Sequence, residues 1–208
     1  MKSVANFGLW NKKAAFFMDT SNLSPSEKET LLKVARQSLE LGLRGEKLPP
    51  LNAETHLLQA DGATFVTLTI NGQLRGCIGA LEPYQPLIED VRVHALAAAQ
   101  NDYRFSPVRP EELDQIEIEI SRLTPPIPLE YGDALDLLRK LRPKVDGVVI
   151  KDGPRRATFL PQVWQQLPDP HVFLSELCQK MGAPSNLWQQ KKLDVLIYQV
   201  EEFHEKRE

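Results

Sequence analysis

The dipeptide Asn71-Gly72 constrains the fold of this chain more than any other short feature. It separates two runs in which apolar and polar residues alternate, ATFVTLTI at 63–70 and QLRGCIGAL at 73–81. Asn-Gly between such runs is typical of a two-residue hairpin turn, because both residues tolerate a positive φ. The pattern therefore predicts an antiparallel hairpin whose turn sets the register of the two strands.

A regular register, counted outward from the turn, decides which side chains surround Cys77. It pairs Val66 with Cys77 and Leu68 with Arg75, and it places all four side chains on one face. Under this register the hairpin predicts a cysteine beside an arginine on the same face.

Glycines stand on both sides of the cysteine. Gly79 shares its face and has no side chain to cover the thiol, whereas Gly76 points to the opposite face. A nearby guanidinium stabilises a thiolate. Two interpretations of Cys77 therefore remain open, a core cysteine packed on the neighbouring strand and a functional thiol.

Helices and a further strand can be read from caps and periodicity. Ser24 and Glu27 have the spacing of a capping box, so a helix is expected to begin there and to end near Gly45. Another helix at 86–102 and an alternating strand at 116–123 follow the hairpin.

The order hairpin, helix, strand recurs in the second half of the chain. There it comprises strands at 145–151 and 155–161, a helix at 170–182 and a single long strand at 193–203. Each unit is too short to bury a sheet face by itself. We therefore predict an α+β fold with a largely antiparallel sheet, in which two related units form a cleft.

The boundaries of these units follow from breaker residues. Residues 1–22 are interpreted as an N-terminal extension, and residues 23–208 as a single domain. The TPPIP segment at 124–128 divides this domain into subunits of about 23–123 and 124–208.

Composition excludes several classes of protein. The chain has 208 residues, a net charge of −3 and two cysteines. This charge provides no global field that attracts nucleic acid or an anionic membrane, and two cysteines do not make a disulfide scaffold. No segment is long enough for a transmembrane helix, and the apolar AAFF at 14–17 is too short for a signal sequence. The expected location is the cytoplasm.

The remaining candidate residues have structural explanations beside the functional ones. Cys178 lies in an apolar helical stripe and is predicted to be a core cysteine. His94 could approach Cys77 from the helix at 86–102, or be a hydrogen-bonded structural residue. Glu82 could serve as a general acid or cap that helix. The histidines lack metal-ligand spacing, so neither a metal nor another cofactor is expected.

Two charged segments also need weighing. The run Asp102 to Phe105 could position a ligand, but a local ion pair with Phe105 in the core is favoured. Basic residues gather in the second half, where a solvated surface is favoured over a phosphate site. They are Arg139, Lys140, Arg142, Lys144, Lys151, Arg155 and Arg156.

The hexapeptide LRGCIG at 74–79 resembles the signature of the AMMECR1 domain family. The similarity continues in LEP at 81–83, NDYRFSPV at 101–108, SRLTPP at 121–126 and FLPQV at 159–163. Together these segments span roughly residues 25–205.

The resemblance implies a two-subdomain α+β protein with the hexapeptide facing a cleft, and a family activity that is poorly defined. It also implies association with radical-SAM and Memo-type proteins in a modification pathway. Many relatives carry His-Gly where this chain has Asp146-Gly147. An aspartate near the thiol would disfavour the thiolate.

Two hypotheses follow. In the first, the protein is a cysteine-dependent enzyme or enzyme component. Cys77 would be its nucleophile, Arg75 would stabilise the thiolate or an anionic substrate, and Gly76, Gly79, Glu82 and His94 would line the substrate site. In the second, the protein is a non-catalytic adaptor whose LRGCIG cleft holds a small molecule or a protein segment.

Overall fold

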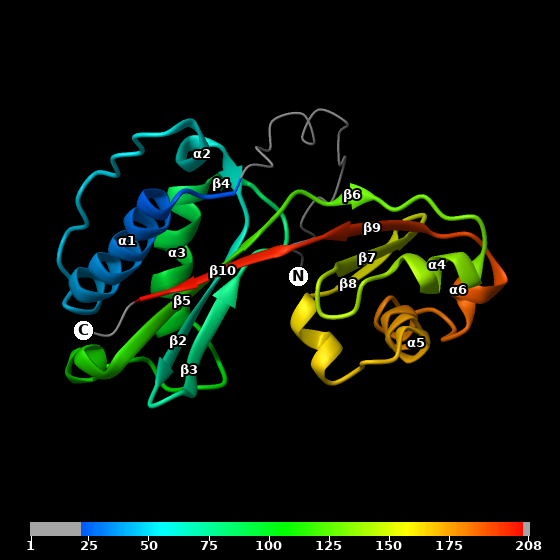
Figure 1. Ribbon diagram of the computed structural model, residues 1–208. Helices are drawn as coiled ribbons and strands as arrows, with labels where there is room; N and C mark the ends of the chain where they lie inside the picture. Colours follow the sequence, from blue (N-terminus) through cyan, green and yellow to red (C-terminus); the bar gives the residue numbers. More distant parts are fainter. Residues whose placement is uncertain (1–21, 206–208) are drawn as a thin grey trace, which may run out of the picture. The chain divides into compact units, whose positions relative to one another are not determined.

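The computed structural model describes residues 22–205 (Figure 1). They form two compact units, with the division between Ile118 and Glu119. Apart from Asn22, the predicted N-terminal extension lies outside the described residues. Within 22–205, no helix is long and apolar enough to cross a membrane.

The helices of the first unit are α1 Pro25–Leu43, α2 His56–Gln59, α3 Leu87–Gln100 and the 3-10 helix Pro110–Gln115. Of these, α1 and α3 begin and end close to the predicted positions. The predicted capping box is present, since the Ser24 hydroxyl accepts the Glu27 N–H and the Glu27 carboxylate accepts the Ser24 N–H. Helix α2 lies in a segment that has no helical period in the sequence.

A four-stranded sheet with the order β10-β5-β2-β3 provides the framework for the candidate site. Its strands are β2 Thr64–Ile70, β3 Gln73–Gly79, β5 Ile116–Leu123 and β10 Val200–His204. Strand β10 pairs antiparallel with β5, and a separate short ladder joins β1 Asp61–Gly62 to β4 Gln85–Pro86. Helix α3 packs on β2 and β3, and α1 packs on α3. Strand β3 is therefore an edge strand with one face covered by a helix.

The predicted register of the hairpin is wrong beyond its first two pairs. A β-bulge inserts Arg75 as an extra residue, so that Leu68 pairs with Gly76 and Thr67 pairs with Cys77. The physical reason lies on the face that α3 covers, where Leu68 is fully buried. A regular register would place the Arg75 guanidinium on that face, and burying it there would be costly. The bulge places Gly76 on that face instead.

The second unit contains a four-stranded sheet with the order β6-β9-β7-β8. Its elements are β6 Ile127–Pro128, α4 Ala134–Lys140, β7 Gly147–Asp152, β8 Arg155–Phe159, the 3-10 helix Pro161–Gln165, α5 Pro170–Lys180, α6 Leu187–Gln190 and β9 Asp194–Tyr198. The core is built around Trp164, whose ring stacks on Phe173 with centroids 3.6 Å apart. The mixture of helix and antiparallel sheet confirms the predicted fold class.

The single long strand predicted at 193–203 is two strands. Strand β9 pairs with β7 in one sheet, and β10 pairs with β5 in the other. The chain changes sheets at Gln199, whose N–H donates to Thr124 Oγ1 and whose carbonyl accepts the Thr124 N–H, both at 2.8 Å. Alternation along the sequence predicts a strand but does not reveal the strand's partner, so this division could not be predicted.

Candidate functional site

Cys77 lies on the face of β3 that α3 does not cover. Its thiol is free and half-buried. The side chain of its cross-strand partner, Thr67, donates a hydrogen bond from Oγ1 to the Cys77 Sγ at 3.2 Å. The hydroxyl of Thr67 is therefore the immediate polar neighbour of the thiol.

The backbone of Cys77 is held from the open edge of the sheet by Asp102 and Arg104. The Cys77 N–H donates to Asp102 Oδ2 at 2.8 Å, and Arg104 Nη2 donates to the Cys77 carbonyl at 3.3 Å. Arg104 also donates from Nε and Nη2 to the two carboxylate oxygens of Asp102, at 2.9 and 2.7 Å. We call this arrangement the Asp102–Arg104 clamp. It occupies the hydrogen-bonding groups that an added strand would use at this residue.

The clamp stabilises the charged forms of both Asp102 and Arg104. Hydrogen bonds from Arg104 hold the pKa of the buried Asp102 carboxyl well below its ordinary range. The pKa of Arg104 is raised, chiefly by its hydrogen bonds to Asp102, with a smaller contribution from the charge of Cys77. The Arg104 side chain is 45% exposed, and its Nη1 contacts no acceptor in residues 22–205.

The predicted anion-binding residue, Arg75, has its hydrogen bonds elsewhere. Its Nε and Nη2 bind the Glu112 carboxylate at 2.8 and 3.1 Å, and Nη1 donates to the Ser106 carbonyl at 2.9 Å. These bonds lower the pKa of Glu112. Arg75 thus ties the 106–112 segment to the hairpin, and its role toward a thiolate stays a prediction.

Both glycines of the hexapeptide make close backbone approaches. A Cβ atom on Gly76 would lie 2.1 Å from the carbonyl oxygen of Ala98 in α3. A Cβ on Gly79 would lie 2.3 Å from the Thr64 carbonyl oxygen. Packing therefore accounts for the absence of side chains here, and their predicted part in substrate binding stays a prediction.

The described contacts of His94 are with Asp90 and Tyr84 and not with the clamp. His94 is buried in α3, and its Nδ1 lies 3.1 Å from Asp90 Oδ2. The same carboxylate oxygen accepts the backbone N–H and the hydroxyl of Thr64 at 2.8 and 2.6 Å. Glu82 is half-buried in the loop between β3 and β4. The structure gives neither residue a described contact with Cys77.

The second cysteine behaves as predicted. Cys178 lies in α5 within the core of the second unit, at 0% exposure, and burial raises the pKa of its thiol.

Asp146 is in the same unit. It accepts the Arg142 N–H at 3.0 Å and the Arg142 Nη2 at 2.6 Å.

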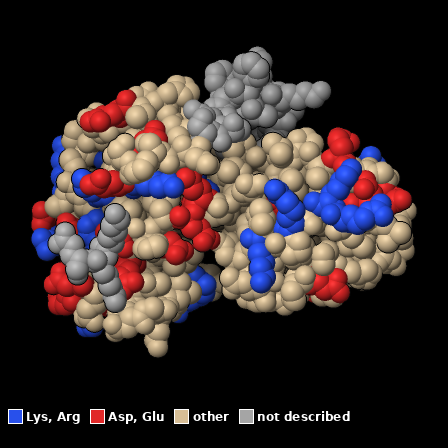
Figure 2. Space-filling view, viewed as in Figure 1, with Lys and Arg blue, Asp and Glu red and all other residues tan. Residues whose placement is uncertain are grey.

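The basic residues of the second unit are interspersed with acidic ones. Asp136 pairs with Arg139 and Lys140, and Asp152 pairs with Arg155. Figure 2 shows blue and red side chains lying among one another on the visible surface. This arrangement agrees with the predicted solvated surface. No group of three His, Cys, Asp or Glu side chains suited to a metal ion occurs within 22–205.

The sequence segments that form this site were recognised only in part. The run Asp102 to Phe105 does contain the expected local ion pair, with Phe105 half-buried beside the Arg104 guanidinium. The hydrogen bonds from Asp102 and Arg104 to the backbone of Cys77 could not be predicted from the sequence, because the two segments are distant in the chain.

These features define a two-unit α+β protein with a clamped cysteine on an edge strand. The sequence pattern of the AMMECR1 family matches residues 32–203, and the chain belongs to this family.

Several archaeal proteins resemble the chain over most of its length. A protein of Methanothermobacter thermautotrophicus is 40% identical over 190 residues, which cover 90% of this chain and 99% of the relative. A protein of Nanoarchaeum equitans is 36% identical over 177 residues, which cover 84% and 98% of the two chains. The crystal structure of the uncharacterized protein PH0010 from Pyrococcus horikoshii is 34% identical, with a TM-score of 0.71, and the match covers 86% of this chain and 91% of that one.

Proposed function

We propose that Cys77 is a reactive thiol that forms a transient covalent bond with a substrate bearing an anionic group. The observation that carries this proposal is the position of Cys77 between the Thr67 hydroxyl and the Asp102–Arg104 clamp, on the face of β3 opposite α3. Cys178, which is fully buried, has no comparable surroundings.

The clamp supplies two things that covalent chemistry at a thiol needs. It fixes the backbone of Cys77 through both its N–H and its carbonyl, and so fixes the position from which the side chain projects. It also brings the Arg104 guanidinium, paired with the Asp102 carboxylate, to the backbone of the residue. Nη1 of Arg104, which has no acceptor within residues 22–205, would bind a carboxylate or phosphate of the substrate.

The proposed step is a substitution. The thiolate of Cys77 bonds to an electrophilic carbon of the substrate, and the leaving group departs with the electron pair of the broken bond. The proton of the thiol passes to solvent before the attack. A second nucleophile then attacks the same carbon and releases the thiolate.

Arg75 has an indirect part in this proposal. Its hydrogen bonds hold the 106–112 segment, which continues directly from the residues of the clamp. As a component of a modification pathway with radical-SAM and Memo-type partners, which the family resemblance implies, the protein would carry the substrate on this thiol.

A non-catalytic adaptor is the second candidate, and one observation favours it. Tyr103, between the two clamp residues, is 95% exposed. An exposed tyrosine beside an arginine is typical of a protein-binding hot spot. Under this hypothesis Tyr103→Ala weakens partner binding, whereas Cys77→Ala is tolerated. Enlarging Gly79 would not test it, because the added atoms meet the Thr64 backbone.

The first experiment is alkylation of the folded protein with iodoacetamide over a range of pH, followed by mass spectrometry, with Cys178 as the internal control. Labelling of Cys77 well below about pH 8.5, the ordinary thiol value, would support the proposal. Labelling as slow as that of Cys178 would contradict it. A complementation assay with Cys77→Ser and Cys178→Ser then tests whether the thiol is needed in the cell.

A further inference from the structure

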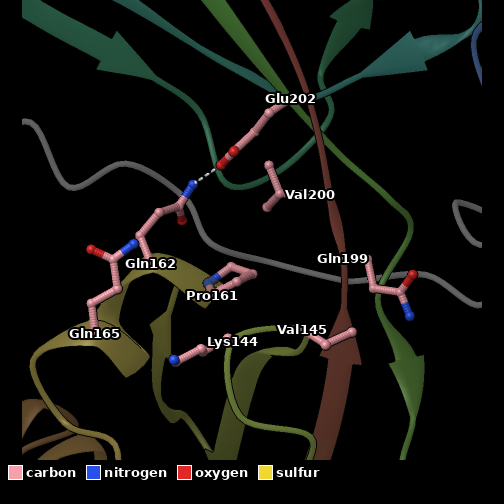
Figure 3. A pocket seen from close by; sticks show the side chains of 8 residues that line it. All are labelled: Lys144, Val145, Pro161, Gln162, Gln165, Gln199, Val200 and Glu202. Atoms are coloured by element: carbon pink, nitrogen blue, oxygen red, sulfur yellow. Dashed lines mark hydrogen bonds between the residues drawn. The ribbon is translucent and has the colours of Figure 1, made fainter. Parts of the chain in front are cut away.

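A pocket of about 330 Å³ opens in the second unit, and none of its lining residues belongs to the Cys77 site. Its walls come from the turn before β7, the 3-10 helix at Pro161–Gln165 and the start of β10 (Figure 3). The lining residues are Lys144, Val145, Pro161, Gln162, Gln165, Gln199, Val200 and Glu202. The volume is within the range of small-molecule sites.

Two of these walls are tied together below the surface. The buried Asp146 accepts hydrogen bonds from Arg142, which closes the turn that carries Lys144. The carbonyl of Asp146 accepts the indole N–H of Trp164 at 2.7 Å, and Trp164 is a fully buried residue of the 3-10 helix. The pocket is therefore formed by backbone segments that the core holds in place.

Lys144 has a backbone conformation that lysine rarely adopts. Its φ is +66°, in the left-handed region that favours glycine and asparagine. Such strained residues occur preferentially at functional sites, where the side chain is needed despite its unfavourable backbone. A glycine would serve the turn better, so the lysine side chain itself calls for an explanation.

Opposite charges lie at the two ends of the pocket. Figure 3 shows Glu202 beside Gln162 at one end and Lys144 at the other, with Pro161 and Val200 between them. Gln162 Nε2 donates to Glu202 Oε1, and within 22–205 the second carboxylate oxygen has no hydrogen-bond donor. Glu202 therefore carries a negative charge at this end of the pocket, and a bound cation would offset it.

We propose that this pocket binds a small zwitterion of the amino-acid or short-peptide class. The ammonium group of the ligand would lie at Glu202 and its carboxylate at Lys144. The apolar part would contact Pro161 and Val200, and the side-chain amide of Gln165 would hydrogen-bond to a peptide group. This inference is independent of the proposed chemistry at Cys77.

The probe is the unblocked dipeptide glycyl-leucine, titrated into the full chain labelled with ¹⁵N and followed by amide chemical shifts. Saturable shifts at residues 144–145, 162–165 and 199–202 are expected. N-acetyl-glycyl-leucine and glycyl-leucine amide each lack one of the two charges, so each should bind about tenfold more weakly or worse. Absence of saturable shifts, or equal binding of the blocked peptides, would overturn the proposal.

Variants identify the charged ends. Glu202→Gln and Lys144→Met should each weaken binding about tenfold, whereas Lys47→Met, an exposed lysine of the first unit, should leave it unchanged. Lys144→Gly removes both the charge and the unfavourable φ, so it should raise the melting temperature while weakening binding. Wild-type affinity in Lys144→Gly would refute the role of the lysine. Cys77→Ser should bind the dipeptide normally, which separates this test from that of the thiol.

Discussion

The carboxylate of Asp102 accepts the backbone N–H of Cys77 at 2.8 Å, across 25 residues of sequence and at the open edge of β3. The same carboxylate binds Arg104, which in turn donates to the Cys77 carbonyl. One side-chain pair therefore satisfies both backbone groups of the cysteine.

Replacing Asp102 by asparagine should destabilise the first unit. The variant loses the charge that Arg104 binds and weakens a hydrogen bond to a buried acceptor, so the free energy of unfolding should fall by about 1–3 kcal/mol. Urea denaturation measures this change. Asp114→Asn, at an exposed position, is the control. An equal effect of the two substitutions would show that the clamp contributes no stability.

Stability should also depend on pH through the clamp. The pKa values of Asp102 and Glu112 are lowered in the folded protein by Arg104 and Arg75 respectively. A lowered carboxyl pKa stabilises the fold above the ordinary value of about 4, and this contribution is lost as the pH falls below it. The free energy of unfolding should therefore decrease as the pH is lowered from about 5 and the two carboxylates become protonated. The decrease should be shallower in Asp102→Asn, and an unchanged slope would contradict the assignment.

Arg104→Gln should slow the alkylation of Cys77. Removing the guanidinium takes away the positive charge beside the residue, and labelling at neutral pH should fall roughly threefold or more. Arg109→Gln is the matched control, because Arg109 is 77% exposed and its partner is Glu112. The rate is obtained from the same mass spectrometric assay. If both variants label at the wild-type rate, the charge of Arg104 has no part in the reactivity of the thiol.

Gly76→Ala should be poorly tolerated. The new methyl group would lie 2.1 Å from the Ala98 carbonyl oxygen, so β3 and α3 must separate. Such overpacking costs about 1–3 kcal/mol. Gly132→Ala is a suitable comparison, since its methyl group meets only Asp136 Oδ2, at 3.8 Å. Thermal unfolding of the two variants should differ clearly, and equal melting temperatures would refute the close approach.

Asp146→Asn should affect the second unit without changing Cys77. All described hydrogen bonds of Asp146 go to Arg142 and Trp164, so the loss of charge should lower the free energy of unfolding by about 1–3 kcal/mol. The labelling rate of Cys77 should remain within about twofold of the wild-type rate. A larger change in that rate would indicate that Asp146 acts on the thiol.

Local rules predicted most of the regular structure. The Ser24 cap, the Asn71-Gly72 turn and the alternating strand at 116–123 are determined by residues within a few positions of each other, and the structure contains all three. The register of the hairpin could not be predicted from local residues. It depends on the packing of Gly76 against Ala98, and that contact forms only when α3 covers the sheet.

The candidate site shows the same limit. Cys77 was identified from its own strand, but the cation beside it was assigned to Arg75, two residues away. In the structure Arg104 donates to the Cys77 carbonyl and Arg75 binds Glu112, while the part of Arg75 toward the thiol stays a prediction. Sequence proximity favours the nearer arginine, whereas the bulge and the loop after α3 determine which one reaches Cys77.

By itself, the sequence determined the fold class, the hairpin, the family and the core position of Cys178. Each of these follows from short-range periodicity, turn residues or a local motif. Only the tertiary structure decided the bulge, the division of the last strand between two sheets, and the Asp102–Arg104 clamp. These depend on hydrogen bonds and close contacts between segments far apart in the chain, because backbone groups at an edge bind whichever partners the packing brings near.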